Sequence, residues 1–281
     1  MKVRCNKLRF NTRYLSLFSI ILSLLSFQVN ASLLISPTRV SFDSRERNKE
    51  IIVVNTSDEV RSYALTWDEK KQNERGLYED LDKDEANVFN TASPYLRFSP
   101  RRITLSPGES QRVKLLLRRK ANMPTEEFHS HLKFTLIPTS VTAPSDSEQE
   151  GISIRMNFFL NYAIPIIIKN HRNTPEVNLL SATYIREASG ESFGNVELKL
   201  ENLNQTSSHG NFTVYFKPQG GSEFEPVGYD NAVNIFHEID TMTRSIPLVK
   251  PVTTPNGRFK LVFEGKEEYT NKLKSEFFWD I

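Results

Sequence analysis

The stretch from Ser106 to Leu117, SPGESQRVKLLL, contains the pattern on which the fold assignment depends. It opens with the turn cluster Ser-Pro-Gly and continues with apolar residues at every second position: Val113, Leu115 and Leu117. A period of two places the apolar side chains on one face of a strand and leaves the other face wet, which is typical of an antiparallel sheet. We therefore expect a turn followed by a half-buried strand.

The same alternation recurs along much of the chain, whereas no segment has a sustained helical stripe. The other alternating triplets are Tyr63, Leu65 and Trp67; Leu132, Phe134 and Leu136; Val196, Leu198 and Leu200; Phe212, Val214 and Phe216; and Phe259, Leu261 and Phe263. Many short strands without helices between them predict an all-β protein built from β-sandwiches.

Composition and charge exclude several other classes of protein. The 281 residues include 36 Lys plus Arg, 34 Asp plus Glu and 38% hydrophobic residues, which excludes collagen, a disordered acidic tail and a multi-span membrane protein. Five of the cations lie in the first 31 residues, which have no acid, so the remainder has 31 bases against 34 acids. We therefore expect no nucleic-acid partner.

Residues 1–31 have the layout of a secretory signal peptide. The five cations precede an uncharged stretch from Leu15 to Phe27, and Val29 and Ala31 resemble the small-residue cleavage pattern. The alternative is an uncleaved anchor, but 13 residues in a helix reach only about 20 Å, against a hydrocarbon core of about 30 Å. Because Cys5 lies in this segment, the mature chain has no cysteine and folds without disulfides.

The mature chain is long enough for two domains. The apolar run Ile164–Ile168 gives way to a polar segment near Lys169 to Pro175, which marks a boundary. We predict an N-terminal domain over residues 32–170 and a C-terminal β-sandwich over residues 171–281.

Three segments carry a resemblance to a known family. Ser36-Pro37-Thr38-Arg39-Val40, the block from Ser93 to Val113, and Phe128–Leu132 resemble the periplasmic pilus-assembly chaperones of the chaperone-usher pathway. The resemblance implies two immunoglobulin-like sandwiches in a boomerang arrangement. It also implies a periplasmic chaperone that lends a strand to pilin-like subunits and delivers them to an outer-membrane usher, with no role for a cofactor, a nucleic acid or, after signal cleavage, a membrane.

The strand to be lent is predicted between Gly151 and Leu160. One face of this segment carries only large apolar residues: Ile152, Ile154, Met156, Phe158 and Leu160. Buried in a subunit, this row is worth on the order of 7 to 15 kcal/mol before ordering costs. The alternative is that the row lines the inner face of the chain's own sandwich. The polar stretch before it, Thr142–Glu150, favours a strand that emerges from a loop.

The resemblance also implies a role for Arg39, as the anchor of the subunit's terminal carboxylate. A planar guanidinium suits this task because its fork can hold both carboxylate oxygens. The alternative is an exposed strand arginine. The family's second anchoring cation, a lysine, falls on Pro165, which has no charge, so Lys169 and Arg155 are the candidates for that role.

No other group of residues in the sequence supports an enzyme active site or a metal site. His129 and His131 face the same way on a predicted strand, but a metal site needs further ligands. The other histidines, His171, His209 and His237, are scattered along the sequence, and the alternative is a surface pair. Asp80, Asp82 and Asp84 mimic a calcium loop that lacks its glycine and final acid. No hydrolase or phosphate-loop motif occurs. The rival function is a structural or adhesive pilin-like sandwich; a sandwich hydrolase or sugar-binding module has no residues in its support.

Overall fold

The computed structural model describes residues 32–281 except 83, 86–88, 139–159 and 187–192. The predicted signal peptide, Arg155 and four members of the predicted donor row, Ile152, Ile154, Met156 and Phe158, therefore lie outside the described residues. Within the described ranges, no helix has the length and apolar character to cross a membrane.

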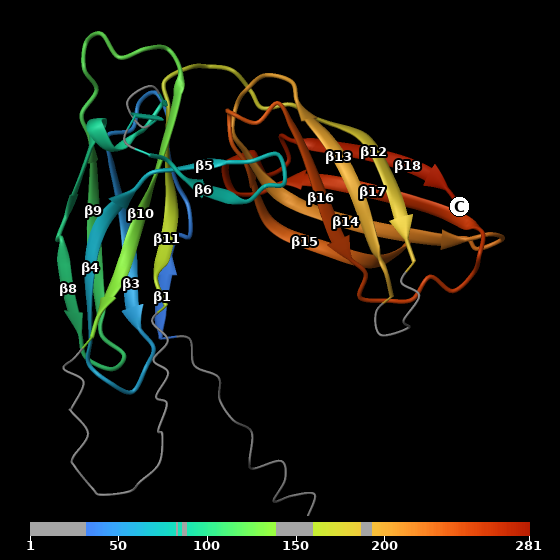
Figure 1. The fold of residues 1–281 in the computed structure, drawn as a ribbon, viewed down its shortest axis with the longest axis horizontal. Helices are drawn as coiled ribbons and strands as arrows, with labels where there is room; N and C mark the ends of the chain where they lie inside the picture. Colours follow the sequence, from blue (N-terminus) through green and yellow to red (C-terminus); the bar gives the residue numbers. More distant parts are fainter. Residues whose placement is uncertain (1–31, 83, 86–88, 139–159, 187–192) are drawn as a thin grey trace, which may run out of the picture.

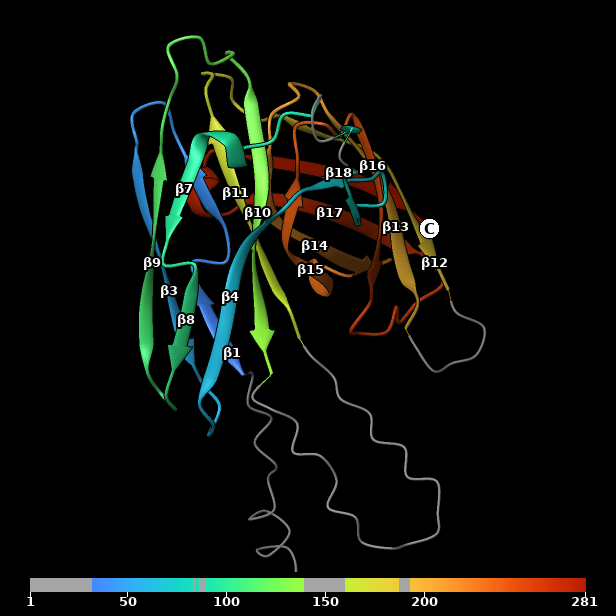
Figure 2. The same ribbon diagram turned by 60° about the vertical axis from the view of Figure 1, so that its left-hand side comes forward.

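The N-terminal sandwich consists of two sheets. One has the order β1 (Leu33–Ser36), β3 (Asn48–Asn55), β9 (Ser110–Leu117) and β7 (Leu96–Ser99). The other has the order β2 (Val40–Phe42), β11 (Tyr162–Lys169), β10 (Glu127–Ile137), β4 (Arg61–Asp68) and β8 (Arg102–Leu105). Between β1 and β2 the chain crosses from the first sheet to the second. Figure 2 shows β3 and β9 of the first sheet side by side.

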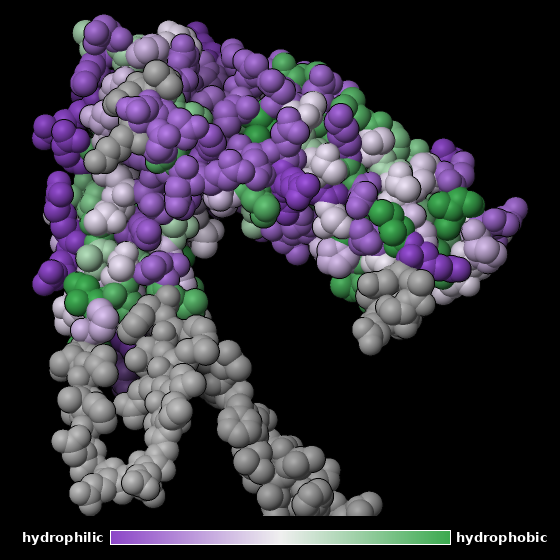
Figure 3. Space-filling view, in the orientation of Figure 1, coloured by the Kyte–Doolittle hydropathy of each residue, from purple (hydrophilic) through white to green (hydrophobic). Residues whose placement is uncertain are grey.

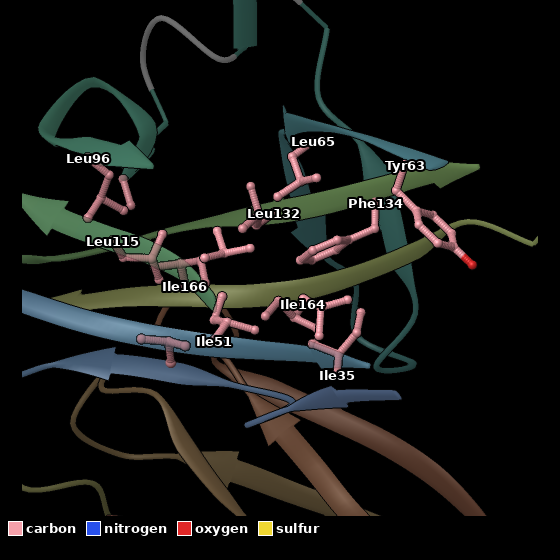
Figure 4. Close-up of a cluster of buried hydrophobic side chains, with 14 of the residues drawn as sticks. Ile35, Ile51, Tyr63, Leu65, Leu96, Leu115, Leu132, Phe134, Ile164 and Ile166 are labelled. Carbon is pink, nitrogen blue, oxygen red and sulfur yellow. The ribbon is translucent and has the colours of Figure 1, made fainter. Parts of the chain in front are cut away.

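The apolar side chains of the alternating pattern fill the space between these two sheets. Val113, Leu115 and Leu117 of β9 are all buried, and they meet the inner row of the opposite sheet, which includes Ile164 and Ile166 (Figure 4). The core thus forms without a disulfide, from side chains that the period of two had already assigned to one face.

The C-terminal sandwich also has its own core. One sheet has the order β12 (Val177–Ile185), β13 (Asn195–Asn202) and β16 (Thr241–Pro247); the other has the order β15 (Glu225–Ile235), β14 (Ser208–Pro218), β17 (Gly257–Gly265) and β18 (Lys274–Asp280). Two short 3₁₀ helices, η1 (Ser93–Tyr95) and η2 (Glu267–Tyr269), connect strands. The predicted all-β class with two immunoglobulin-like sandwiches is confirmed, and the two sandwiches lie at an angle to each other (Figure 1).

A small hairpin of the first sandwich helps to fix this angle. It consists of β5 (Lys70–Gln72) and β6 (Tyr78–Asp80), and it extends towards the second sandwich (Figure 1). The Gln72 side chain accepts a hydrogen bond from the Phe236 backbone N–H at 3.0 Å and donates one to the Asn234 carbonyl at 2.9 Å.

The junction of the two sandwiches presents a mostly hydrophilic surface above the hollow between them (Figure 3).

Candidate functional site

The first feature of the site is an unpaired strand edge. β11 pairs with β10 along its whole length, from Tyr162 to Lys169, but with β2 only from Ile166 to Ile168. Among the described residues, no strand pairs with β11 on the β2 side between Tyr162 and Pro165. β2 is only three residues long because the chain enters it from the other sheet. The exposed N–H and C=O groups of such an edge can pair with another chain.

The inner face of β11 has the same even-numbered spacing in the sequence as the predicted donor row. Ile164, Ile166 and Ile168 are buried in the core of the first sandwich. They stand at even-numbered positions, as do the members of the row that ends at Leu160. Leu160 is the one member of the row within the described residues, and its side chain is 65% exposed. An extended chain from Leu160 into β11 would keep the row on one face. The donor role of the row stays a prediction.

Arg39 lies at the end of this open edge, immediately before β2. It is buried, with 3% of its surface exposed, and its Nη1 donates a hydrogen bond to Oε1 of Glu268 at 2.5 Å. Glu268 belongs to η2 in the second sandwich, and Glu267 beside it lies 3.9 Å from the same nitrogen. Arg39 is therefore not an exposed strand arginine but a cation in the cleft between the domains.

Lys169, at the end of β11, converges on the same carboxylate. Its Nζ donates to Oε1 of Glu268 at 3.0 Å, contacts the Tyr269 hydroxyl, and lies 4.2 Å from the centre of the Tyr269 ring. The structure thus brings together Arg39 and Lys169, two of the three cations singled out in the sequence; the third, Arg155, lies outside the described residues. Pro165 lies in the strand four residues earlier, opposite His131, and carries no charge.

The charges in this cluster shift one another's pKa values. Burial alone would raise the pKa of Glu268, but Arg39 and Lys169 lower it to about 2. Burial lowers the pKa of Lys169, and the neighbouring Arg39 adds to this effect. Burial would also lower the pKa of Arg39, but Glu268 keeps it above its ordinary value. At neutral pH the cluster therefore pairs an ionised carboxylate with a charged guanidinium.

The cluster has hydrogen-bonding capacity left for a second carboxylate. A pocket of about 380 Å³ opens over Arg39, Lys169 and Glu268, beside Pro37 and Val40. Nε and Nη2 of Arg39 are buried and have no hydrogen-bond partner among the described residues. A guanidinium with two unused donors is suited to bind a further anion.

Sequence reasoning missed Glu268 and Tyr269. Arg39 and Glu268 are 229 residues apart, and the pair Glu267-Glu268 has no motif that distinguishes it from charged surface. Only the way in which the second sandwich packs on the first places this carboxylate between Arg39 and Lys169.

The alternative of a surface histidine pair is wrong. His129 and His131 are 0% and 2% exposed, because the second sandwich and the β5–β6 hairpin cover the outer face of β10. The His129 ring stacks on Phe236 with ring centres 4.2 Å apart, and the His131 ring meets Tyr78 edge-on at 5.0 Å.

Comparisons with known proteins give matches among solved structures only. No protein-family model matches the sequence, and no curated protein matches it. The chaperone CupB2 of Pseudomonas aeruginosa is 13% identical, with 88% of this chain and 98% of that chain covered at a TM-score of 0.43. The class 5 fimbriae chaperone CfaA is 12% identical, with coverages of 88% and 98% and a TM-score of 0.42.

A third match is a complex of a chaperone with a pilin. It comes from the Salmonella enterica structure of the SafA pilin with the SafB chaperone, at 12% identity, coverages of 89% and 96%, and a TM-score of 0.41. These proteins are of the kind that the sequence resembles. Because each of these three TM-scores is below 0.5, the likenesses assign no role to any residue of this chain.

Proposed function

We propose that this chain is a periplasmic chaperone for pilin-like subunits, which it binds by strand addition along β11 and delivers to an outer-membrane usher. The observation that carries the proposal is the position of two cations, Arg39 and Lys169, at the end of a strand edge that is unpaired within the described part of the chain. The open edge supplies main-chain hydrogen bonds, and the apolar row from Ile152 to Leu160 contacts the subunit's core. The two cations bind the subunit's terminal carboxylate and so fix where the added strand ends.

The electrostatics of the site select the direction of the added strand. β2 runs parallel to β11 and begins opposite Ile166, so Arg39 lies where the open edge ends. A subunit strand that runs parallel to β11 along the open edge brings its carboxyl terminus towards Arg39 and Lys169. An antiparallel strand would bring its amino terminus, whose positive charge both cations repel. The proposed partner strand is therefore the last strand of the subunit, in the parallel orientation.

Glu268 then acts as an internal stand-in for the subunit's terminal carboxylate. Its carboxylate already accepts from Nη1 of Arg39 and from the ammonium of Lys169, while Nε and Nη2 of Arg39 have no partner in the described ranges. The incoming terminus competes with Glu268 or shares the cations with it. Each charge-assisted hydrogen bond is worth about 1.5 to 3 kcal/mol net, which is less than the apolar row supplies. The row therefore holds the subunit, and the cations set its register.

Co-expression with a subunit tests the proposal. The subunit to use is the exported protein whose gene lies beside that of an outer-membrane usher, an arrangement that the proposal predicts. The subunit should accumulate in the periplasm with the wild-type chain. It should be degraded when Arg39 is changed to Ala, or when Met156 and Phe158 are both changed to Asp.

Two matched variants control for general damage. Arg112→Ala removes an arginine whose side chain is 70% exposed on the other sheet, and Asn157→Asp adds a charge at a position of opposite parity in the donor segment. Both should protect the subunit as the wild type does. Full accumulation with Arg39→Ala and with the double Asp variant would refute the mechanism, and incorporation of the chain itself into surface fibres would favour the structural-protein alternative.

A further inference from the structure

Three potential metal ligands meet in the seam between the two sandwiches, away from the Arg39 cluster. His129 comes from β10 of the first sandwich, whereas His237 and Glu238 occupy the turn after β15 of the second. One nitrogen of each histidine and one carboxylate oxygen of Glu238 all lie within 4.8 Å of one another. Neither domain holds the three ligands by itself.

We propose that His129, His237 and Glu238 bind a divalent transition-metal ion, for which Zn²⁺ is the best fit, and that the ion ties the two domains together. Two imidazoles and one carboxylate form a ligand set that zinc accepts, with water in the fourth position. Mg²⁺ and Ca²⁺ prefer oxygen ligands, so this set discriminates against them.

The distances from the two histidines to Glu238 are close to those of a tetrahedral site, and the two histidine nitrogens lie within 4.8 Å of each other. Bonds of about 2.0 to 2.2 Å to one tetrahedral ion place neighbouring ligand atoms about 3.3 to 3.6 Å apart. Nε2 of His129 lies 3.1 Å from Oε1 and 3.2 Å from Oε2 of Glu238, and Nδ1 of His237 lies 3.5 Å from Oε2. An ion therefore fits with small side-chain adjustments.

The surroundings hold the ligands in place. The side chains of His129, His237 and Glu238 are 0%, 13% and 16% exposed. The Gln72 backbone N–H donates to Oε1 of Glu238 at 2.9 Å, which orients the carboxylate, and the His129 ring is stacked on Phe236. In known metal sites, hydrogen bonds to the ligands and packing around them hold the ligands in position.

The unused nitrogens are where metal binding requires them. Nδ1 of His237 is buried and has no hydrogen-bond partner among the described residues, so its lone pair is available. Nε2 of His129 faces Glu238, and a metal bound at Nε2 requires the neutral tautomer with its hydrogen on Nδ1. Nδ1 is also without a partner among the described residues.

Calorimetric titration with Zn²⁺ tests the proposal on the mature chain, freed of any affinity tag and dialysed against a chelator. The expected result is one zinc ion per chain and no response to Mg²⁺ or Ca²⁺. Removing a group that only orients a metal ligand typically lowers metal affinity about 10- to 100-fold. His237→Asn removes a ligand itself, so it should lower zinc affinity about 100-fold or more. Zinc should also raise the Tm of the wild type but not of this variant.

Two further variants keep the result interpretable. Glu238→Gln retains the size of the side chain and an acceptor for the Gln72 N–H, so it should fold and still bind zinc at least about tenfold more weakly. His209→Gln removes a buried histidine outside the three ligands and should bind zinc as the wild type does. Zinc binding that is absent, or equally tight in wild type, His237→Asn and Glu238→Gln, would overturn the proposal. Because no subunit is present, the outcome is independent of the proposed chaperone function.

Discussion

The two halves of β11 differ in what covers them, although both belong to one strand. From Ile166 to Ile168 the strand has β2 on one edge, β10 on the other, and both faces buried, since even the outward-facing Ile167 is 0% exposed. From Tyr162 to Pro165 only the β10 edge is paired among the described residues, and Ala163 is exposed. The covered half contributes to stability, whereas the open half has no partner strand on its second edge among the described residues. An apolar strand pattern alone therefore does not separate structure from function.

The largest expected effect is a loss of stability, caused by a substitution in the covered half of β11. Ile166→Ala removes a fully buried side chain from the first core and should lower the free energy of unfolding by about 2 to 5 kcal/mol. Urea denaturation followed by circular dichroism measures the loss. Leu34→Ala, at a position that is 54% exposed, is the control and should change stability by less than about 0.5 kcal/mol. Equal losses in the two variants would contradict the assignment of Ile166 to the core.

The next effect separates binding from stability at the open half. Leu160→Ser changes a side chain that is 65% exposed in the free protein, so stability should shift by less than about 0.5 kcal/mol. If Leu160 enters a subunit groove, the lost burial is worth about 1.5 to 3 kcal/mol, which weakens subunit binding about 10- to 100-fold. Pull-down or calorimetry with the subunit measures this. Destabilisation with unchanged subunit binding would instead place Leu160 in the chain's own core.

The smallest effect concerns the carboxylate that lies where the two halves meet. Glu268→Gln removes a charge shared by Arg39 and Lys169, and because the Glu268 side chain is one-third exposed, the expected loss of stability at neutral pH is about 1 kcal/mol. Without this internal competitor, the affinity for the subunit's terminal carboxylate should rise by up to about tenfold. Weaker subunit binding by this variant would contradict the stand-in role of Glu268.

The pH dependence of this pair has a defined sign. The pKa of Glu268 is lowered to about 2 in the folded chain, from an ordinary value of 4.5. Its contribution is therefore fully present above about pH 4.5 and is lost as the pH falls towards 2, because the unfolded chain takes up the proton first. The difference in stability between wild type and Glu268→Gln should shrink over this window. A difference that stays constant from pH 7 to pH 2.5 would show that Glu268 is not paired.

The fold was predictable to the extent that it depends on local pattern. The alternation at Val113, Leu115 and Leu117 predicted a buried face, and the structure buries all three residues. The pattern did not reveal that His129 and His131 are buried, because the covering surface comes from the other domain and from a hairpin about 60 residues earlier in the sequence.

The candidate site was predictable only in part. Arg39 was singled out by the family resemblance and Lys169 by its charge near Pro165, and the structure brings both to one carboxylate. Whether they anchor a subunit stays a prediction. Glu268, which joins them, had no signal in the sequence, since an acidic pair in a polar segment is usually solvated surface.

The sequence by itself determined the class of fold and one face of each strand, because side-chain parity is a local property of an extended chain. The tertiary structure alone decided which edge of β11 is open, and that Glu268 meets Arg39 across the two domains. The same packing placed His129 against His237 and Glu238. Strand order and domain packing depend on contacts between residues far apart in the sequence, and no local pattern encodes them.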